Sequence, residues 1–158
     1  MNNLPLSTEA PRSRRRVRIR FTKTDDLQWI GHRDLVRTFE RGFRRAGLEL
    51  AMSEGFHPKP KMSFPTALGM GIQATDEVME VELYEPVDPL RVAEQLRPVM
   101  PMGLELKSVV LRPEGARKLR VSRLCYEIPI PPEREATVRS RVAEVLSQPN
   151  LQYARDKR

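Results

Sequence analysis

Residues that could transfer protons or bind phosphate are concentrated between positions 31 and 64 of this 158-residue chain. The stretch contains both histidines, His32 and His57, and Asp34 stands two positions after the first. Histidine transfers protons near neutral pH, so these residues could do acid–base chemistry if the fold brought them together. Because spacing along the chain does not show that they converge, we assign no catalytic residue. We predict that the stretch binds an anion or a partner, and that His32, Asp34, Arg37 and His57 share one site.

The first half of the stretch predicts a helix with an arginine-rich face. Gly31 and Gly47 stand where such a helix would begin and end, and Asp34 suits the positive end of its dipole. Apolar residues recur at helical spacing: Leu35, Val36, Phe39, Phe43 and Ala46. Arginines take much of the remaining surface, with Glu40 among them: Arg33, Arg37, Arg41, Arg44 and Arg45. Arginine is suited to bidentate contact with phosphate.

The second half of the stretch predicts a basic loop at 53–61 that leads into an extended segment at 62–64. Pro58 and Pro60 fix backbone angles and so lower the entropy cost of holding the neighbouring cations in place. Neither histidine has a cysteine or a second histidine nearby, so we assign no metal ligand. The predicted binding residues of the helix and the loop are His32, Asp34, Arg37, Arg41, Arg44, Arg45, Ser53, Phe56, His57, Lys59 and Lys61.

Two familiar signatures fail on their context. Residues 32–35 read His-Arg-Asp-Leu, as in a kinase catalytic loop, but Phe39 occupies the position of the required asparagine. Residues 69–74 match a loose dinucleotide-binding pattern, but a turn and an alternating strand follow it instead of a helix. We reject both readings and expect the glycines at 69 and 71 to serve a tight bend.

Around this stretch, the sequence predicts a ferredoxin-like α+β sandwich over residues 16–113. The predicted order is strand, helix, strand, strand, helix, strand: 16–21, 31–46, 48–52, 79–84, 90–99 and 104–110. In this βαββαβ topology the first and third strands are neighbours. Arg18 and Arg20 would then lie across from Glu80 and Glu82 on the face without helices, where opposite charges are mildly stabilising.

Two further regions flank this domain. Residues 1–15 predict a disordered basic tail. Residues 114–158 predict a linker and a partial second βαβ half, with a strand at 124–130, a helix at 133–146 and the start of a strand at 151–155. The abrupt end of this half suggests a truncated second unit.

Composition narrows the classes of partner. A formal net charge of +7 and a pI of about 10.1 favour a polyanionic partner, with nucleic acid first. Cys125 is the only cysteine, so the chain can form no intrachain disulfide and no cysteine-based zinc or iron–sulfur site. No apolar run approaches the ~20 residues of a membrane helix, and the N-terminus lacks the apolar core of a secretory signal. We expect a cytoplasmic protein without membrane contact.

Motif spacing over 16–158 resembles one family, the uncharacterised radical-SAM-linked proteins with the DUF2344 domain. The motifs that carry the resemblance are Phe21-Thr22-Lys23, Gly31-His32-Arg33-Asp34, Arg37, Glu40-Arg41, the Arg44–Leu48 run, the Ser53–Pro58 run, Met62-Ser63-Phe64, the Leu68–Gly71 run and Glu77. Departures from the family pattern are Gly31 in place of a common serine, Arg33 in place of an apolar residue, and Lys59 in place of a frequent histidine. The last departure weakens any histidine-based metal site.

The resemblance implies a domain without an established reaction, found alone or joined to a radical S-adenosylmethionine enzyme and often beside genes of RNA metabolism. The positions carried over by motif are His32, Asp34, Arg37, Arg41, Arg45, Ser53, Gly55, Phe56, His57 and Pro58. This chain would need no cofactor of its own, because the partner enzyme would carry the iron–sulfur cluster and S-adenosylmethionine. Cys125 alone could not hold that cluster.

Three functional hypotheses follow. The first is a non-catalytic binding or adaptor module that contacts RNA and acts with a radical S-adenosylmethionine enzyme in RNA modification or processing. The second is a protein–protein interaction subunit of such an enzyme that does not touch RNA. The third is an acid–base enzyme acting on RNA through His32, Asp34 and His57.

Overall fold

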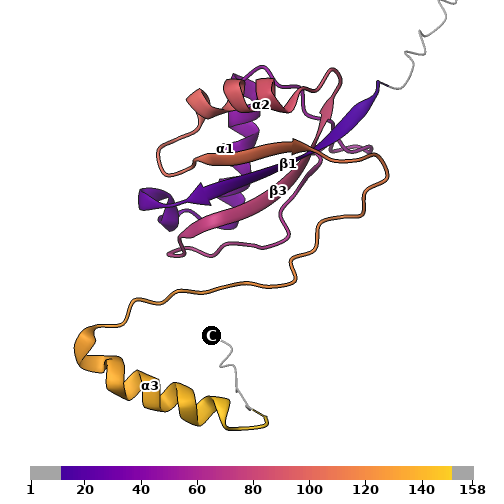
Figure 1. Cartoon of the computed structure of the whole chain (residues 1–158). Coiled ribbons are helices and arrows are strands. Elements are labelled where there is room, and N and C mark those ends of the chain that lie inside the picture. Colours follow the sequence, from indigo (N-terminus) through magenta and orange to yellow (C-terminus); the bar gives the residue numbers. More distant parts are fainter. Residues whose placement is uncertain (1–11, 151–158) are drawn as a thin grey trace, which may run out of the picture. The chain divides into compact units, whose positions relative to one another are not determined.

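The computed structural model describes residues 12–150, and the chain divides into two compact units between Val121 and Ser122. The elements, in chain order, are β1 (Arg14–Lys23), η1 (Asp25–Trp29), α1 (His32–Arg45), β2 (Met62–Ser63), β3 (Ala74–Tyr84), α2 (Pro89–Leu96), η2 (Arg97–Val99), β4 (Leu106–Leu111) and α3 (Pro132–Leu146). All but α3 belong to the first unit (Figure 1). The mixture of helices with an antiparallel sheet confirms the predicted α+β class.

The sheet has four strands in the order β2-β3-β1-β4, and neighbouring strands are antiparallel. The predicted pairing of β1 with β3 is confirmed, and Arg18 lies opposite Glu80 as expected. The prediction for Arg20 was wrong by four positions, because the residue opposite Glu82 is Arg16. Arg20 lies opposite Val78 instead, and its guanidinium pairs with Asp76.

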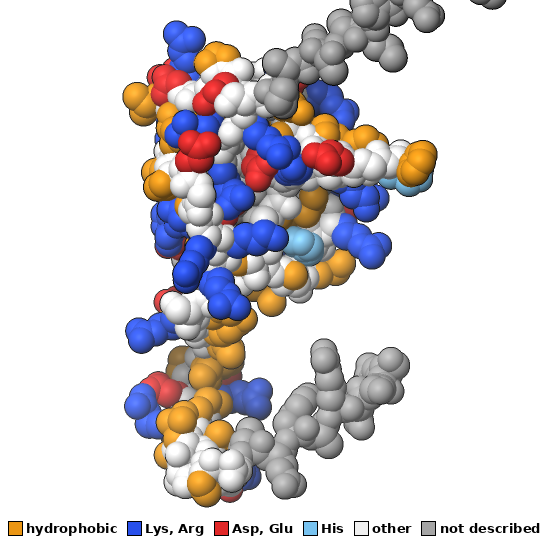
Figure 2. Space-filling view, turned by 90° about the vertical axis from the view of Figure 1, so that its right-hand side faces the viewer, with side chains coloured by type: hydrophobic (Ala, Val, Ile, Leu, Met, Phe, Trp, Pro, Cys, Tyr) orange, Lys and Arg blue, Asp and Glu red, His pale blue; other side chains and the backbone are white. Residues whose placement is uncertain are grey.

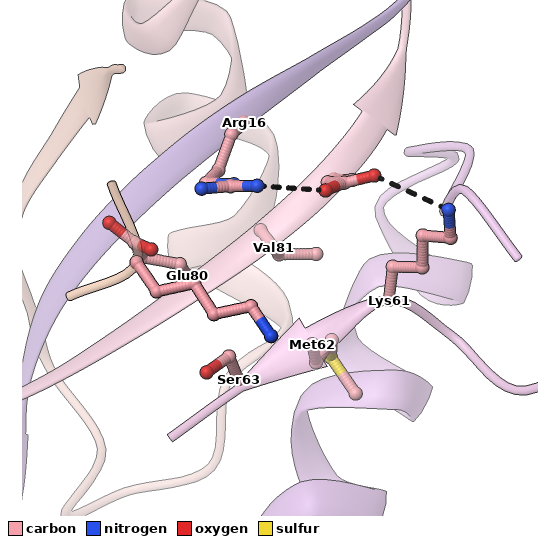
Figure 3. Close-up of a pocket in the computed structure, with 8 residues that line it drawn as sticks. Arg16, Lys61, Met62, Ser63, Glu80 and Val81 are labelled. Carbon is pink, nitrogen blue, oxygen red and sulfur yellow. Dashed lines mark hydrogen bonds and ion pairs between the residues drawn. The ribbon is translucent and has the colours of Figure 1, made fainter. Parts of the chain in front are cut away.

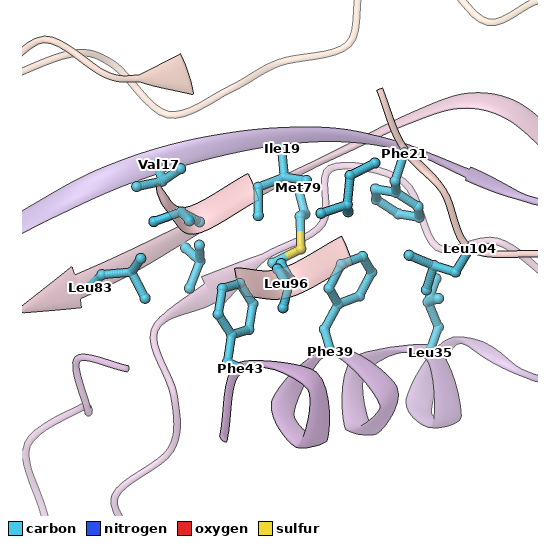
Figure 4. Packing of buried hydrophobic residues seen from close by; sticks show 13 residues of the cluster. Val17, Ile19, Phe21, Leu35, Phe39, Phe43, Met79, Leu83, Leu96 and Leu104 are labelled. Atoms are coloured by element: carbon cyan, nitrogen blue, oxygen red, sulfur yellow. The ribbon is translucent and has the colours of Figure 1, made fainter. Parts of the chain in front are cut away.

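Strict alternation along β1 and β3 places one set of apolar side chains against the helices. Val17, Ile19 and Phe21 of β1 are buried, as are Met79, Val81 and Leu83 of β3. α1 contributes Leu35, Phe39 and Phe43 to the same cluster, and α2 contributes Val92 and Leu96 (Figure 4). The two helices therefore pack on one face of the sheet, and most charged residues of β1 and β3, Lys23 excepted, occupy the other.

The edge of the sheet beside β3 differs from the prediction. The expected strand at 48–52 forms only isolated bridges, at Leu50 and Met52, and the edge strand is β2. Two segments share this edge: the amide of Ala51 donates to the carbonyl of Glu82, and the amide of Glu82 donates to the carbonyl of Lys61. Each segment covers part of β3, so residues 52–60 leave the sheet between them as a loop.

Both ends of the described chain also correct the prediction. β1 begins at Arg14, so Arg14 and Arg15 belong to the strand rather than to the tail, while residues 1–11 lie outside the described residues. No strand forms at 124–130, where every side chain is exposed and no strand of the second unit is present among the described residues to pair with it. α3 confirms the helix predicted at 133–146, and the strand start at 151–155 lies outside the described residues.

Candidate nucleic-acid interface

The solvent face of α1 carries more arginine than its surroundings neutralise. The helix buries its apolar stripe and leaves all five arginines exposed. Their one ion pair in the described chain joins Arg37 Nη1 to Asp34 Oδ1 at 3.4 Å, with side chains 67% and 58% exposed. Such an exposed pair contributes little, because water and salt screen it. Arg41 Nη2 donates a hydrogen bond to Thr38 Oγ1 at 3.2 Å, which leaves its positive charge without an acidic partner.

Three arginines of the helix make no hydrogen bond or ion pair within residues 12–150: Arg33, Arg44 and Arg45. Arg44 and Arg45 lie in the last turn, where a cation interacts favourably with the helix dipole. That stabilisation leaves their guanidinium N–H groups free to donate to an anion from outside the chain. The face can therefore bind phosphate without first breaking an ion pair at these positions.

The loop at 53–59 is closed by its own hydrogen bonds. The amide of Ser53 donates to the carbonyl of Lys59 at 2.8 Å, and the amide of Lys59 donates to Ser53 Oγ at 2.9 Å. Met52 and Pro60 form a bridge beneath them. Gly55 has φ +115°, a conformation that side chains rarely adopt, so the glycine suits the bend near the tip. Ser53 thus serves to close the loop.

The closed loop presents an aromatic side chain to solvent. Phe56 is fully exposed, at 103% of its reference area, although phenylalanine is usually at least partly buried. His57 and Lys59 are also exposed and their side chains make no hydrogen bond or ion pair within the described residues. Lys61 differs, because its ammonium lies 3.9 Å from Glu82 and its side chain is only 28% exposed. Lys61 therefore belongs to the sheet edge and not to the tip of the loop.

His32 connects the start of α1 to the segment that follows the loop. Its ring meets Phe64 edge to face, with centroids 5.4 Å apart, and Phe64 in turn contacts Phe39. Nδ1 of His32 is buried and has no hydrogen-bond partner among the described residues. A buried polar nitrogen without a partner costs stability, so this position stands out within the predicted site.

The structure brings together only part of the predicted four-residue site. Asp34 and Arg37 form the exposed ion pair, and His32 begins the same helix two residues before Asp34. No hydrogen bond, ion pair or ring contact in the described chain joins His57 to any of them. Histidine side chains and many Lys and Arg side chains share the face in Figure 2. A common site for these residues stays a prediction.

Sequence reasoning missed Lys23, which is fully buried at the end of β1. Its ammonium donates to the carbonyls of Gln28 at 3.3 Å and Gly69 at 3.0 Å. Burial lowers the pKa of Lys23, because the charged form loses solvation. The lysine ties η1 to the bend at Gly69–Gly71, where Gly71 has φ +80° as expected for a tight turn. The alternation that buries Phe21 also points Lys23 inward, so the signal was available.

Neither a metal-binding cluster nor a membrane-spanning helix is found among the described residues. Within 12–150, no group of three or more His, Cys, Asp or Glu residues could hold a metal ion. No helix among the same residues is long and apolar enough to cross a membrane.

The first unit is thus an α+β domain whose exposed helix and projecting loop are basic. The chain belongs to the DUF2344 family, described as an uncharacterized protein conserved in bacteria, and the match covers residues 16–158. A search of curated proteins found no match to the chain. This match confirms the DUF2344 membership that the sequence motifs indicated.

Proposed function

We propose that this chain is a non-catalytic adaptor module that binds RNA through α1 and the loop at 53–59. The observation that carries the proposal is the set of α1 arginines without acidic partners in the described chain. Arginine contacts phosphate in a planar, bidentate geometry, and most nucleic-acid affinity without sequence preference comes from such contacts. The formal charge of +7 gives the same attraction at longer range.

Phe56 would supply the second kind of contact. Proteins that bind single-stranded RNA combine cations along the backbone with aromatic side chains on which bases stack. Phe56 is exposed on a loop that its own hydrogen bonds hold closed, so stacking would require little ordering of the loop. His57 and Lys59 follow Phe56 along the loop and would contact the base or the adjacent phosphate.

The finer assignments of fold and partner belong to the same proposal. The strand order β2-β3-β1-β4 with two helices on one face supports a ferredoxin-like sandwich. The partner would be a radical S-adenosylmethionine enzyme in the cytoplasm that carries the iron–sulfur cluster and S-adenosylmethionine, since this chain has a single cysteine. The adaptor would hold RNA for modification or processing by that enzyme.

An interaction subunit without RNA contact is the second candidate. The exposed Phe56 favours it, because aromatic side chains that enter a pocket of a partner protein often dominate binding energy. A radical S-adenosylmethionine enzyme captured by the chain in the absence of RNA, through a contact that Phe56→Ala abolishes, would support this candidate over the first.

Fluorescence anisotropy with a labelled single-stranded RNA tests the first proposal. The variant carrying Arg37→Ala, Arg41→Ala and Arg45→Ala should bind the RNA much more weakly than the unmodified chain. The matched control carries Arg91→Ala, Arg97→Ala and Arg120→Ala, which remove the same charge from exposed positions outside α1. If both triple variants lost the same RNA affinity, the effect would come from net charge and not from α1. If the unmodified chain did not bind RNA at low salt, RNA recognition would be refuted. RNA cleavage that His57→Ala abolishes would instead establish the acid–base enzyme.

A further inference from the structure

The face of the sheet opposite the helices contains a pocket of about 290 Å³ beside β2 and β3. Charged and polar side chains from four segments line it (Figure 3): Arg16 of β1, Lys61 and Ser63 at β2, Glu80 and Glu82 of β3, and Lys118 from the segment after β4. Met62 and Val81 also border it, but their side chains pack against the core on the helix side of the sheet. The volume lies just below the range for pockets that hold drug-sized ligands, roughly 300–1,000 Å³.

Cations outnumber carboxylates around this pocket. Glu82 lies within 4 Å of three cationic groups, on Arg14 at 3.6 Å, Arg16 at 3.3 Å and Lys61 at 3.9 Å. These three cations therefore share one carboxylate, which can neutralise only one of their positive charges. The dashed lines of Figure 3 show the contacts of Arg16 and Lys61 with the same carboxylate.

The second carboxylate is shared in the same way. Glu80 is only 4% exposed, and its Oε1 accepts from Arg18 at 2.8 Å and lies 3.4 Å from Arg112 Nε. Arg112 Nε is buried and makes no hydrogen bond of good geometry in the described chain. Lys118 is exposed and has no acidic partner there. Two carboxylates thus face six cations, and the unbalanced positive charge favours a further anion.

The carboxylates also hold the cations in position. Arg16 is fixed at both ends of its guanidinium, because Nη2 contacts Glu82 and Nη1 donates to the carbonyl of Ala116 at 3.1 Å. The latter bond holds the segment that carries Lys118 close to β1. Ser63 contributes a hydroxyl that makes no hydrogen bond within residues 12–150, so it can donate to a ligand. Such preorganised donors bind an anion with a small entropy cost.

We propose that this pocket binds the phosphate group of a nucleotide-sized ligand through Lys118, Lys61, Arg16 and the hydroxyl of Ser63. The side chains of Met62 and Val81 face the core, so the phosphate would supply the contacts in this pocket. A free mononucleotide and the phosphorylated end of an RNA strand present the same phosphate monoester. The pocket uses the helix-free face of the sheet, so it is independent of the RNA contacts proposed for α1 and the loop.

Isothermal titration of the full chain with AMP, adenosine and inorganic phosphate tests the proposal. AMP and phosphate should bind, and adenosine should not. Lys118→Gln should weaken AMP about tenfold or more, because it removes a charge-assisted hydrogen bond. Its exposed side chain has no partner in the described chain, so the variant should keep the circular dichroism spectrum of the unmodified chain. Lys107→Gln is the control, since Lys107 pairs with Asp76 and does not line the pocket.

Competition experiments then distinguish the source of the phosphate. Displacement of AMP by a 5′-phosphorylated RNA, but not by the same RNA with a 5′-hydroxyl, assigns the pocket to an RNA end. No displacement by either strand assigns it to a free nucleotide. The α1 triple variant should retain AMP binding, so failure of one proposal leaves the other intact. Equal binding of AMP and adenosine, or equal loss in Lys118→Gln and Lys107→Gln, overturns the phosphate pocket.

Discussion

Replacing Phe56 by alanine should separate RNA binding from folding. The ring is fully exposed and buries no area in the free chain, so its loss removes no packing. Surface changes of this kind alter the free energy of unfolding by at most about 0.5 kcal/mol. In a complex, one base stacked on an aromatic ring contributes about 1–3 kcal/mol. Phe56→Ala should therefore weaken RNA binding by about 5- to 150-fold, because about 1.4 kcal/mol corresponds to a factor of ten in Kd.

Two measurements on the same variant test this reasoning. Fluorescence anisotropy gives the Kd for single-stranded RNA, and urea unfolding gives the free energy of unfolding. Met102→Ala is the matched control, because Met102 is an apolar side chain of the first unit that is 86% exposed and lies outside the loop. Unchanged RNA affinity in Phe56→Ala, or an equal loss in Met102→Ala, would refute a stacking role. A large loss of stability would show that the ring packs against the protein in solution.

Two further predictions concern the fold that supports the site. Gly103→Ala should lower the free energy of unfolding by about 3 kcal/mol or more, since φ is +85° and a Cβ would lie 2.5 Å from the carbonyl oxygen of Thr24. Gly115→Ala, at φ +70° with open space, should cost only about 1–2 kcal/mol in urea unfolding, and equal losses would contradict the close contact. The hydrogen bond from Arg20 holds the pKa of Asp76 below its ordinary 3.8, so its stabilisation is present above that value and is lost as the pH falls through the lowered pKa. Asp76→Asn should cost at most about 1 kcal/mol near neutral pH and progressively less in acid, whereas a loss independent of pH would contradict the ion pair.

Local patterns predicted the parts of the fold that depend on local physics. Alternation over β1 and β3 identified both strands, and their neighbouring positions in the sheet followed from the order of elements. The apolar stripe of α1 placed its ends within one or two residues of those observed. The sequence did not predict that residues 49–51 and 61–63 would each hydrogen-bond to a different part of β3. Which segment pairs with which part of the strand depends on long-range register.

The candidate site, like the fold, could be predicted only in part from the sequence. Exposure of the α1 arginines follows from helical periodicity and could be predicted. The position of His57 relative to His32 could not, since it depends on the path of a closed loop. The phosphate pocket was also beyond the sequence, because Arg112 and Lys118 reach the face of β3 from a distant segment. The sequence prediction paired each β1 arginine with one β3 glutamate. It therefore did not show that cations outnumber carboxylates on this face of the sheet.

Salt dependence of RNA affinity tests the central claim most directly. Each phosphate contact to a single strand contributes about 0.7 to the slope of log affinity against log salt concentration. Loss of Arg37, Arg41 and Arg45 should therefore reduce the magnitude of that slope by about 2. The control variant that lacks Arg91, Arg97 and Arg120 should keep the slope of the unmodified chain. Identical slopes in the unmodified chain and the α1 variant would contradict RNA binding by this helix.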